Sequence, residues 1–133
     1  MTKELIKLSG ITKDYQMGEN TVHALRDINL EAGFGEYLAI LGPSGSGKST
    51  LMNIIGCMDS IQEGKYFLAG LPIHSMADEQ LTVVRNRLIG FIFQRYHLIP
   101  TYTVLQNVMM PLLVRGASHD EAAEAAAKKL SML

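Results

Sequence analysis

The sequence predicts an α/β fold, and three observations point to it. A compact apolar run over residues 37–41 ends in a glycine-rich stretch, and a helical pattern over residues 49–58 follows directly. Short stretches of alternating apolar and polar residues precede this unit, and helical patterns prevail after it. With 47% apolar and 19% charged residues in a chain of 133, the composition is that of a globular protein rather than a disordered one.

The N-terminal region predicts an antiparallel pair of strands. Residues 5–8 and 22–30 alternate in polarity, and the turn-like residues 16–20 separate them. Residues 37–41 then predict a strand that is buried on both faces, and residues 49–58 a buried helix. Since no repeat or Gly/Ser-rich linker divides the chain, we expect one folding unit with subregions.

The second half of the chain predicts mainly helices. The expected elements are a strand over residues 64–70 and helices over 78–88, 104–114 and 121–130. Residues 90–93 predict a further short buried strand that leads into a loop through Pro100. Ser118, three residues before Glu121, predicts a capping box at the start of the Ala-rich last helix.

Charge and cysteine content exclude several classes of protein. The net charge is −1 and no run of Lys and Arg occurs, so we expect no nucleic-acid partner. The single cysteine, Cys57, rules out an internal disulfide, and the N-terminus lacks the layout of a signal peptide, which favours the cytoplasm. The longest apolar stretch, residues 108–114, is far shorter than the roughly 18 to 20 residues that cross a bilayer. Any membrane association is therefore expected to come through a partner.

A phosphate-binding loop is the strongest motif in the chain. Residues 42–49 read Gly-Pro-Ser-Gly-Ser-Gly-Lys-Ser and match G-x-x-x-x-G-K-[ST] between a predicted strand and a predicted helix. Its glycines permit positive φ and close approach, so that backbone N–H groups and the helix start can face phosphate oxygens. Lys48 is expected to offset charge on the β- and γ-phosphates, and the Ser49 hydroxyl to be a Mg²⁺ ligand. The nucleotide-binding candidates here are Gly42, Ser44, Gly45, Ser46, Gly47, Lys48, Ser49 and Thr50. The alternative is a Gly/Ser turn with a solvated lysine.

Residues 41–56, which continue the loop with Leu-Met-Asn-Ile-Ile-Gly, resemble the Walker A segment of ABC-type ATPases. Within that family the lipoprotein-release and macrolide-export subgroup is the most similar. The resemblance extends over essentially the whole chain through Asp14-Tyr15, Gly35-Glu36 and the Gly-Phe-Ile-Phe-Gln of residues 90–94. It implies a P-loop NTPase fold with an N-terminal antiparallel β subdomain and a RecA-like core, truncated before the signature motif. The implied subregions are about 1–36 for the β subdomain, about 37–94 for the core and Q-loop, and about 95–133 for the start of the helical subdomain.

The resemblance also implies two site residues outside the loop. Tyr15 matches the aromatic residue that stacks on adenine, a contact that contributes on the order of 1 kcal/mol. Gln94 matches the Q-loop glutamine, which reaches Mg²⁺ and the attacking water and senses the membrane partner. Lys48 and Gln94 are thus the expected catalytic residues, and Ser49 and Gln94 the expected Mg²⁺ ligands. The alternatives are a tyrosine that covers the hairpin and a glutamine that is only a loop residue.

What is absent from the sequence matters as well. The signature motif, the Walker B strand that ends in Asp-Glu and the switch histidine do not follow Gln94. Residues 1–133 are therefore expected to bind Mg-ATP without hydrolysing it. Two segments imitate the missing motifs: residues 8–10, which we assign to a strand end and turn, and residues 54–59, in which Asp59 is expected to be a helix-end residue.

By resemblance, the complete protein is expected to couple ATP binding and hydrolysis to export or lipoprotein release through a membrane permease. The permease is expected as a separate subunit or a fused domain, a second ATP-binding subunit as head-to-tail partner, and the inner face of the plasma membrane as location. Two other readings remain open. One is a nucleotide-dependent regulatory protein similar to the cell-division ATPase. The other is a non-transport P-loop enzyme, such as a nucleotide kinase or GTPase, which shares the loop but not the Tyr15 and Gln94 segments.

Overall fold

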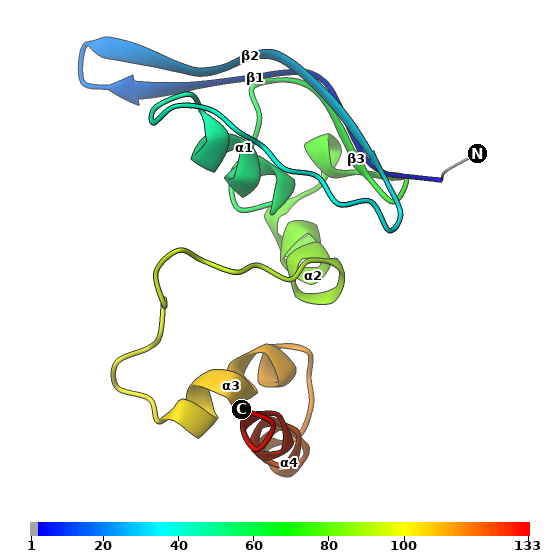
Figure 1. Cartoon of the computed structure of the whole chain (residues 1–133), viewed down its shortest axis with the longest axis vertical. Helices are drawn as coiled ribbons and strands as arrows, with labels where there is room; N and C mark the ends of the chain where they lie inside the picture. Colours follow the sequence, from blue (N-terminus) through cyan, green and yellow to red (C-terminus); the bar gives the residue numbers. More distant parts are fainter. Residues whose placement is uncertain (1–2) are drawn as a thin grey trace. The chain divides into compact units, whose positions relative to one another are not determined.

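The computed structural model describes residues 3–133, which form two units with their boundary along the chain after Arg85. The first contains a four-stranded antiparallel sheet in the order β2-β1-β3-β4 (Figure 1). Its strands are β1 (Glu4–Met17), β2 (Asn20–Gly33), β3 (Glu63–Leu68) and β4 (Leu71–Pro72). The helices of the first half are α1 (Lys48–Ile55), the 3₁₀ turn η1 (Ile73–Ser75) and α2 (Asp78–Leu88), within which the boundary between the units lies.

The predicted antiparallel strand pair is confirmed and is longer than the sequence indicated. β1 and β2 have 14 residues each, and Met17 pairs with Asn20 across the tight turn. Gly18 in that turn has a φ of 64°, which glycine adopts without steric cost. The predicted strand after residue 63 and the predicted helix over residues 78–88 are also confirmed, as β3 and α2.

A bulge in β1 corrects the prediction that residues 8–10 are a strand end and turn. The strand continues through this segment, and the register with β2 shifts between Leu8 and Ile11. Gly10 has a φ of 61°, typical of a bulge residue. The extra residue lets Leu8 and Ile11, three positions apart, both point into the core, where they are 1% and 0% exposed. An unbulged strand would turn one of the two to the opposite face.

The core of the first unit lies between the sheet and α1, which faces it in Figure 1. Leu51 and Ile54 of α1 are buried, and the Tyr66 hydroxyl on β3 donates to the Ile55 carbonyl at 2.8 Å. That bond satisfies a carbonyl at the helix end, while burial raises the pKa of Tyr66 far above its usual value. Just beyond α1, Cys57 is 3% exposed with a φ of 55°, and its carbonyl accepts a hydrogen bond from Arg85 at 2.6 Å.

The two buried strands predicted over residues 37–41 and 90–93 are wrong for this structure. Neither segment is a strand, and side chains predicted to be buried are open to solvent: Tyr37 is 93%, Leu41 91% and Ile92 97% exposed. A strand exists only through backbone hydrogen bonds to a neighbour, and within residues 3–133 no parallel partner pairs with either run. Their apolar composition is typical of strands, but no strand within residues 3–133 pairs with either run.

The second unit is built on the helical hairpin of α3 (Val104–Val114) and α4 (His119–Leu130). Its small core joins Met109 to Ala122 and Ala126. Both helices begin with a capping box, Thr103 with Gln106 and the predicted Ser118 with Glu121. Among residues 3–133, no helix is both long and apolar enough to span a membrane.

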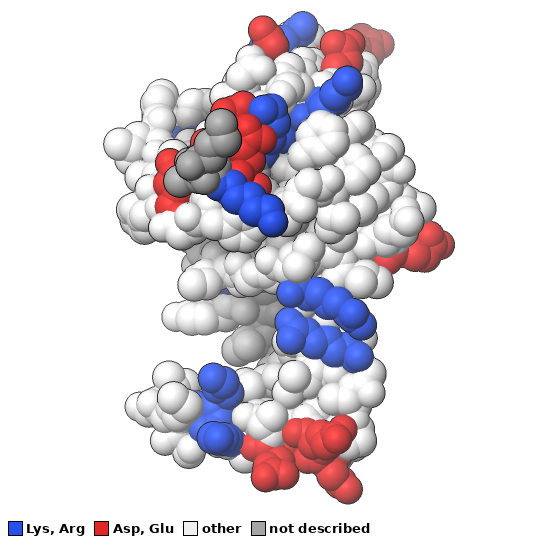
Figure 2. Space-filling model, turned by 90° about the vertical axis from the view of Figure 1, so that its right-hand side faces the viewer, with Lys and Arg blue, Asp and Glu red and all other residues white. Residues whose placement is uncertain are grey.

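Charged side chains on the sheet form local pairs. The Lys7 ammonium on β1 lies 3.1 Å from the Glu4 carboxylate and 2.9 Å from that of Glu31 on β2. Basic and acidic side chains are mixed in the upper part of Figure 2 rather than gathered by sign. Exposed pairs of this kind contribute little to stability, so the first unit depends mainly on its apolar core.

The bulge makes Gly64 a sensitive position. A Cβ added there would lie 2.5 Å from the Gly10 carbonyl oxygen and 2.6 Å from that of Ser9. We expect Gly64→Ala to lower the free energy of unfolding by about 3 kcal/mol, because backbone of the paired strand has to move. Gly70→Ala is the matched control, since Gly70 also has positive φ but open space around it, and should cost about 1 kcal/mol. Equal losses in urea titrations of the two variants would contradict this account.

Candidate functional site

The glycine-rich loop before α1 has the geometry of an anion cradle. Gly45 and Gly47 have φ values of 80° and 93°, the positive φ that the sequence predicted for these two glycines, and a loop of this conformation can present its N–H groups to an anion. Gly42 differs, because its φ is not positive. A Cβ there would lie 2.7 Å from the Ser46 hydroxyl oxygen, so glycine at position 42 serves close approach instead. α1 begins at Lys48 and presents its N-terminus to the same loop.

Lys48 folds back onto the loop that precedes it. Its ammonium donates to the carbonyls of Gly42 and Pro43 at 2.5 and 2.6 Å and to the Ser46 hydroxyl at 3.2 Å. These acceptors are neutral, whereas a phosphate oxygen is charged and forms a stronger bond with the same ammonium. The Lys48 ammonium therefore already lies at the loop, where it can bind an anion.

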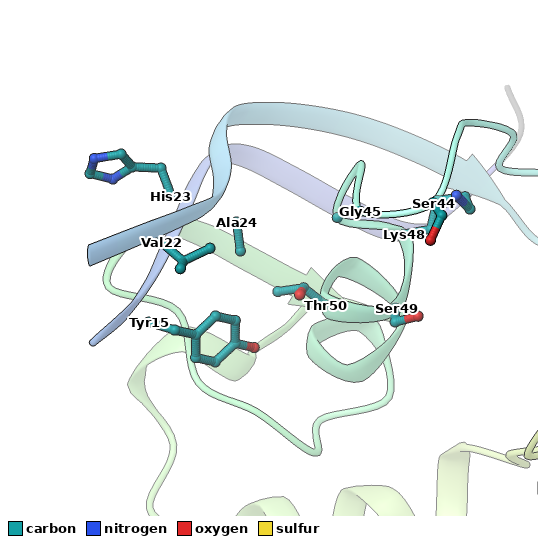
Figure 3. Close-up of a pocket in the computed structure, with 10 residues that line it drawn as sticks. Tyr15, Val22, His23, Ala24, Ser44, Gly45, Lys48, Ser49 and Thr50 are labelled. Carbon is teal, nitrogen blue, oxygen red and sulfur yellow. The ribbon is translucent and has the colours of Figure 1, made fainter. Parts of the chain in front are cut away.

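An open hollow of about 530 Å³ extends from the loop to the β1–β2 hairpin. It is lined by Tyr15, Val22, His23, Ala24, Ser44, Gly45, Gly47, Lys48, Ser49 and Thr50. In Figure 3, Tyr15 points toward Thr50 on α1, with Val22 and Ala24 of β2 beside them and the loop beyond. The volume is in the range of small-molecule sites, so the hollow can hold a ligand with one end at the loop and the other at Tyr15.

β2 and the loop are in direct contact at one edge of the hollow. A Cβ on Gly47 would lie 2.6 Å from the Ala24 carbonyl oxygen and 3.0 Å from Leu25. Only glycine allows this approach, which sets the distance between the loop and the hairpin. Of the predicted loop residues, Gly42 and Ser46 are outside the lining of the hollow; they shape the loop and hold Lys48.

Sequence reasoning missed the three β2 residues of the hollow. No motif marks Val22, His23 and Ala24. The observation that could have found them is the register of the hairpin, which pairs Tyr15 with Val22. The His23 ring is 2.9 Å from the Asp14 carboxylate and also contacts Arg26, and these two contacts hold it at the edge of the hollow. A turn assigned at residues 18 and 19 would have placed residue 22 opposite residue 15.

A network of polar groups beneath Tyr15 was missed as well. The Tyr15 hydroxyl donates to one Asp59 carboxylate oxygen at 2.6 Å, and the Lys13 ammonium donates to the other at 2.7 Å. Lys13 also donates to the Ser60 carbonyl at 2.7 Å and lies 5.1 Å from the centre of the Tyr15 ring. Asp59, expected only as a helix-end residue, follows α1 by four positions and connects that helix end to β1.

The network influences the ionisation of Asp59 and Tyr15. Burial alone would raise the pKa of Asp59, but hydrogen bonds from Lys13, Tyr15 and the Ser60 N–H outweigh it and hold the pKa below its usual value. For Tyr15, burial and the bond to the Asp59 carboxylate raise the pKa above its usual value, against a smaller opposing effect of Thr50. At neutral pH the pair is therefore a phenol that donates to a carboxylate.

Gln94 lies in the second unit, in a segment that is neither helix nor strand, and its side chain is exposed. Nearby, the rings of Phe91 and Phe93 contact each other in a tilted arrangement with centres 4.6 Å apart, and the His97 ring lies tilted against Phe93 at 4.4 Å. Ser49 belongs to the first unit, where its exposed hydroxyl lines the hollow. A shared Mg²⁺ site of Ser49 and Gln94 therefore remains a prediction.

Comparison with known proteins agrees with this geometry. The model of the family described as ABC transporter matches residues 25–133. The chain is 46% identical over 119 residues to an uncharacterized ABC transporter ATP-binding protein, MJ0796, of Methanocaldococcus jannaschii. It is 45% identical over 133 residues to the macrolide export ATP-binding/permease protein MacB of Rhodopseudomonas palustris. The resemblance of residues 41–56 and 90–94 to this family is thereby confirmed.

Among solved structures, the dimeric post-hydrolysis state of the ATP-binding cassette MJ0796 bound to ADP and Pi matches with a TM-score of 0.87 and 44% identity over 96% of this chain. The P-loop NTPase fold class is thus confirmed, in its N-terminal part. The chain spans 51% of MJ0796 and 55% of the related Bacillus subtilis protein YknY, about half of each, and 20% of MacB.

Acid should weaken the first unit through Asp59. Its pKa is lower in the folded than in the unfolded chain, so the stabilisation is complete above the unfolded pKa of about 4 and is lost as the pH falls through the folded value. We expect Asp59→Asn to reduce the fall in the free energy of unfolding between pH 6 and pH 2, about two units on either side of the unfolded pKa. The exposed carboxylate of Glu124 on α4 provides the control, as Glu124→Gln. An unchanged acid dependence in Asp59→Asn, measured by urea unfolding, would show that the network does not operate.

Proposed function

Because the chain belongs to the ABC transporter family, we propose that it holds Mg-ATP for an ATP-binding subunit that drives export or lipoprotein release through a membrane permease. The observation that carries the proposal is that the phosphate loop and Tyr15 line one hollow. A nucleoside triphosphate has an anionic end and an aromatic end, and this hollow has a partner for each. The role of the macrolide exporter among the relatives supports the export part of the proposal.

The phosphate end would be bound by backbone and by Lys48. Loop N–H groups around Gly45 and Gly47 donate to phosphate oxygens, and the N-terminus of α1 adds its positive dipole end. The Lys48 ammonium exchanges its bonds with the Gly42 and Pro43 carbonyls for bonds with the phosphates, which lie within the same loop. Little of the side chain has to be reorganised for this exchange.

The donor set of the loop also fits a magnesium ion. The Ser49 hydroxyl lies in the hollow next to Lys48, and hydroxyl and phosphate oxygens are ligands that Mg²⁺ prefers. Gln94 is the second proposed ligand and the proposed contact to the attacking water. When bound, Mg²⁺ offsets phosphate charge, and the chain's own residues orient the nucleotide around it.

Tyr15 gives the base a stacking surface, which distinguishes this proposal from a nucleotide kinase or GTPase with the same loop. The Tyr15 ring lies at the far end of the hollow from the loop, beside Val22 and Ala24. We further propose a head-to-tail ATP-binding partner, a permease that is separate or fused, and a position at the inner face of the plasma membrane. A cell-division type regulatory protein would share the nucleotide site but not the coupling to cargo.

Removal of the loop ammonium should abolish most nucleotide binding. We expect Lys48→Ala to weaken ATP binding about tenfold to a hundredfold, as the loss of charge-assisted hydrogen bonds predicts. Lys65, exposed on β3 away from the hollow, provides the control, and Lys65→Ala should bind as the wild type does. Calorimetric titration of the purified protein with Mg-ATP measures both.

Two results of that titration would count against the proposal. Equal ATP affinities of Lys48→Ala and the wild type would mean that the loop is not the phosphate site. Equal affinities for GTP and ATP that Tyr15→Ala does not alter would favour the other class of P-loop enzyme.

Residues 1–133 alone should show negligible ATPase activity. By resemblance to ABC-type ATPases, the glutamate that activates water belongs to the Walker B strand. No such strand follows Gln94 in residues 1–133. Phosphate release by the 133-residue polypeptide should therefore match a protein-free blank. Turnover that disappears in Lys48→Ala would overturn this expectation, because it would assign hydrolysis to this chain's own site.

A further inference from the structure

The strongest unassigned feature is the polar network of Lys13, Asp59 and Ser60 beneath Tyr15. The Lys13 side chain is only 8% exposed and that of Asp59 27%, so both charges are largely removed from water. Such burial is costly unless every bond is satisfied. Here both Asp59 oxygens are used, one by Tyr15 and the other by Lys13 and the Ser60 N–H.

The attachment of β1 to the segment after α1 does not depend on the network alone. Gln62 already attaches β1 to the segment after α1, because its side chain donates to the Asp14 carbonyl at 3.0 Å and accepts from the Asp14 N–H. The Gln62 N–H also donates to the Thr12 carbonyl at 3.1 Å. What the network adds to this attachment is a fixed position for the Tyr15 ring.

Two contacts define that position. The bond from the Tyr15 hydroxyl to Asp59 fixes the far end of a side chain that has only two rotatable bonds. The Lys13 ammonium lies over the ring at 5.1 Å from its centre and so occupies one face. The opposite face is then the one left for a ligand in the hollow that Tyr15 lines.

We infer that Asp59 and Lys13 are positioning residues for the nucleotide base: they hold the Tyr15 ring in the orientation in which a purine stacks on it. The inference rests on the proposed function, since it assumes that the hollow takes a nucleotide. A ring that is already ordered loses less freedom on binding, so affinity for the base is higher than with a mobile ring.

The test compares ATP with inorganic tripolyphosphate, which carries the phosphates without a base. We expect Asp59→Ala to weaken ATP binding about threefold to tenfold, the range set by ordering one side chain, and to leave tripolyphosphate binding unchanged. Tyr15→Phe keeps the ring and loses the anchor, so it should show the same pattern. The double variant should be no weaker than either single one, because both break the same bond.

The control is Glu124→Ala, which removes one exposed negative charge in the second unit and should bind both ligands as the wild type does. Circular dichroism shows whether each variant is folded. If Asp59→Ala is not folded, Tyr15→Phe decides alone, since it leaves the Lys13–Asp59 pair in place.

Each other outcome overturns a specific statement. Unchanged ATP affinity in folded Asp59→Ala and in Tyr15→Phe, with tight binding by the wild type, rejects the positioning role and leaves the proposed function standing. Equal weakening of ATP and tripolyphosphate means that Asp59 supports the loop instead. Failure of the wild type to bind either ligand rejects the proposed function and this inference with it.

Discussion

The close approach of Gly47 to the Ala24 carbonyl is the constraint on which the site depends. It joins the start of α1 to β2, and β2 carries the hairpin that brings Tyr15 to the other end of the hollow. A side chain at position 47 would separate the two by the width of a methyl group. The glycine-rich loop is therefore more than a local motif, because its distance to the Tyr15 end of the hollow is set by a contact with a strand more than 20 residues earlier in the chain.

The features that sequence predicted well are those whose cause is local. The capping box of Ser118 and Glu121 needs only a four-residue pattern, and the loop glycines at 45 and 47 have the predicted positive φ because the motif itself requires it. The helices over 78–88 and 104–114 follow from local periodicity, and the structure has them with the predicted bounds. Bulges are harder: Gly10 gave no signal that β1 continues through it.

The sequence did not predict contacts between residues that are far apart along the chain. Residues 37–41 have the composition of a buried strand, yet a strand needs partners, and Tyr37 and Leu41 remain exposed without them. For Asp59 the sequence missed contacts that do exist, since nothing around it in the sequence indicates Lys13 or Tyr15, more than 40 positions away. In both cases the decisive neighbour is distant in sequence, which a pattern within a short window does not contain.

The single cysteine of the chain provides an intrinsic reporter on this region. Cys57 is 3% exposed, and burial raises the pKa of its thiol, so the folded chain protects it from alkylating reagents both sterically and chemically. It lies two residues before Asp59, and Arg85 holds its carbonyl. The rate of thiol modification therefore measures how often the segment after α1 opens, without any added label, and a ligand that binds only the closed form slows that rate in proportion to its occupancy.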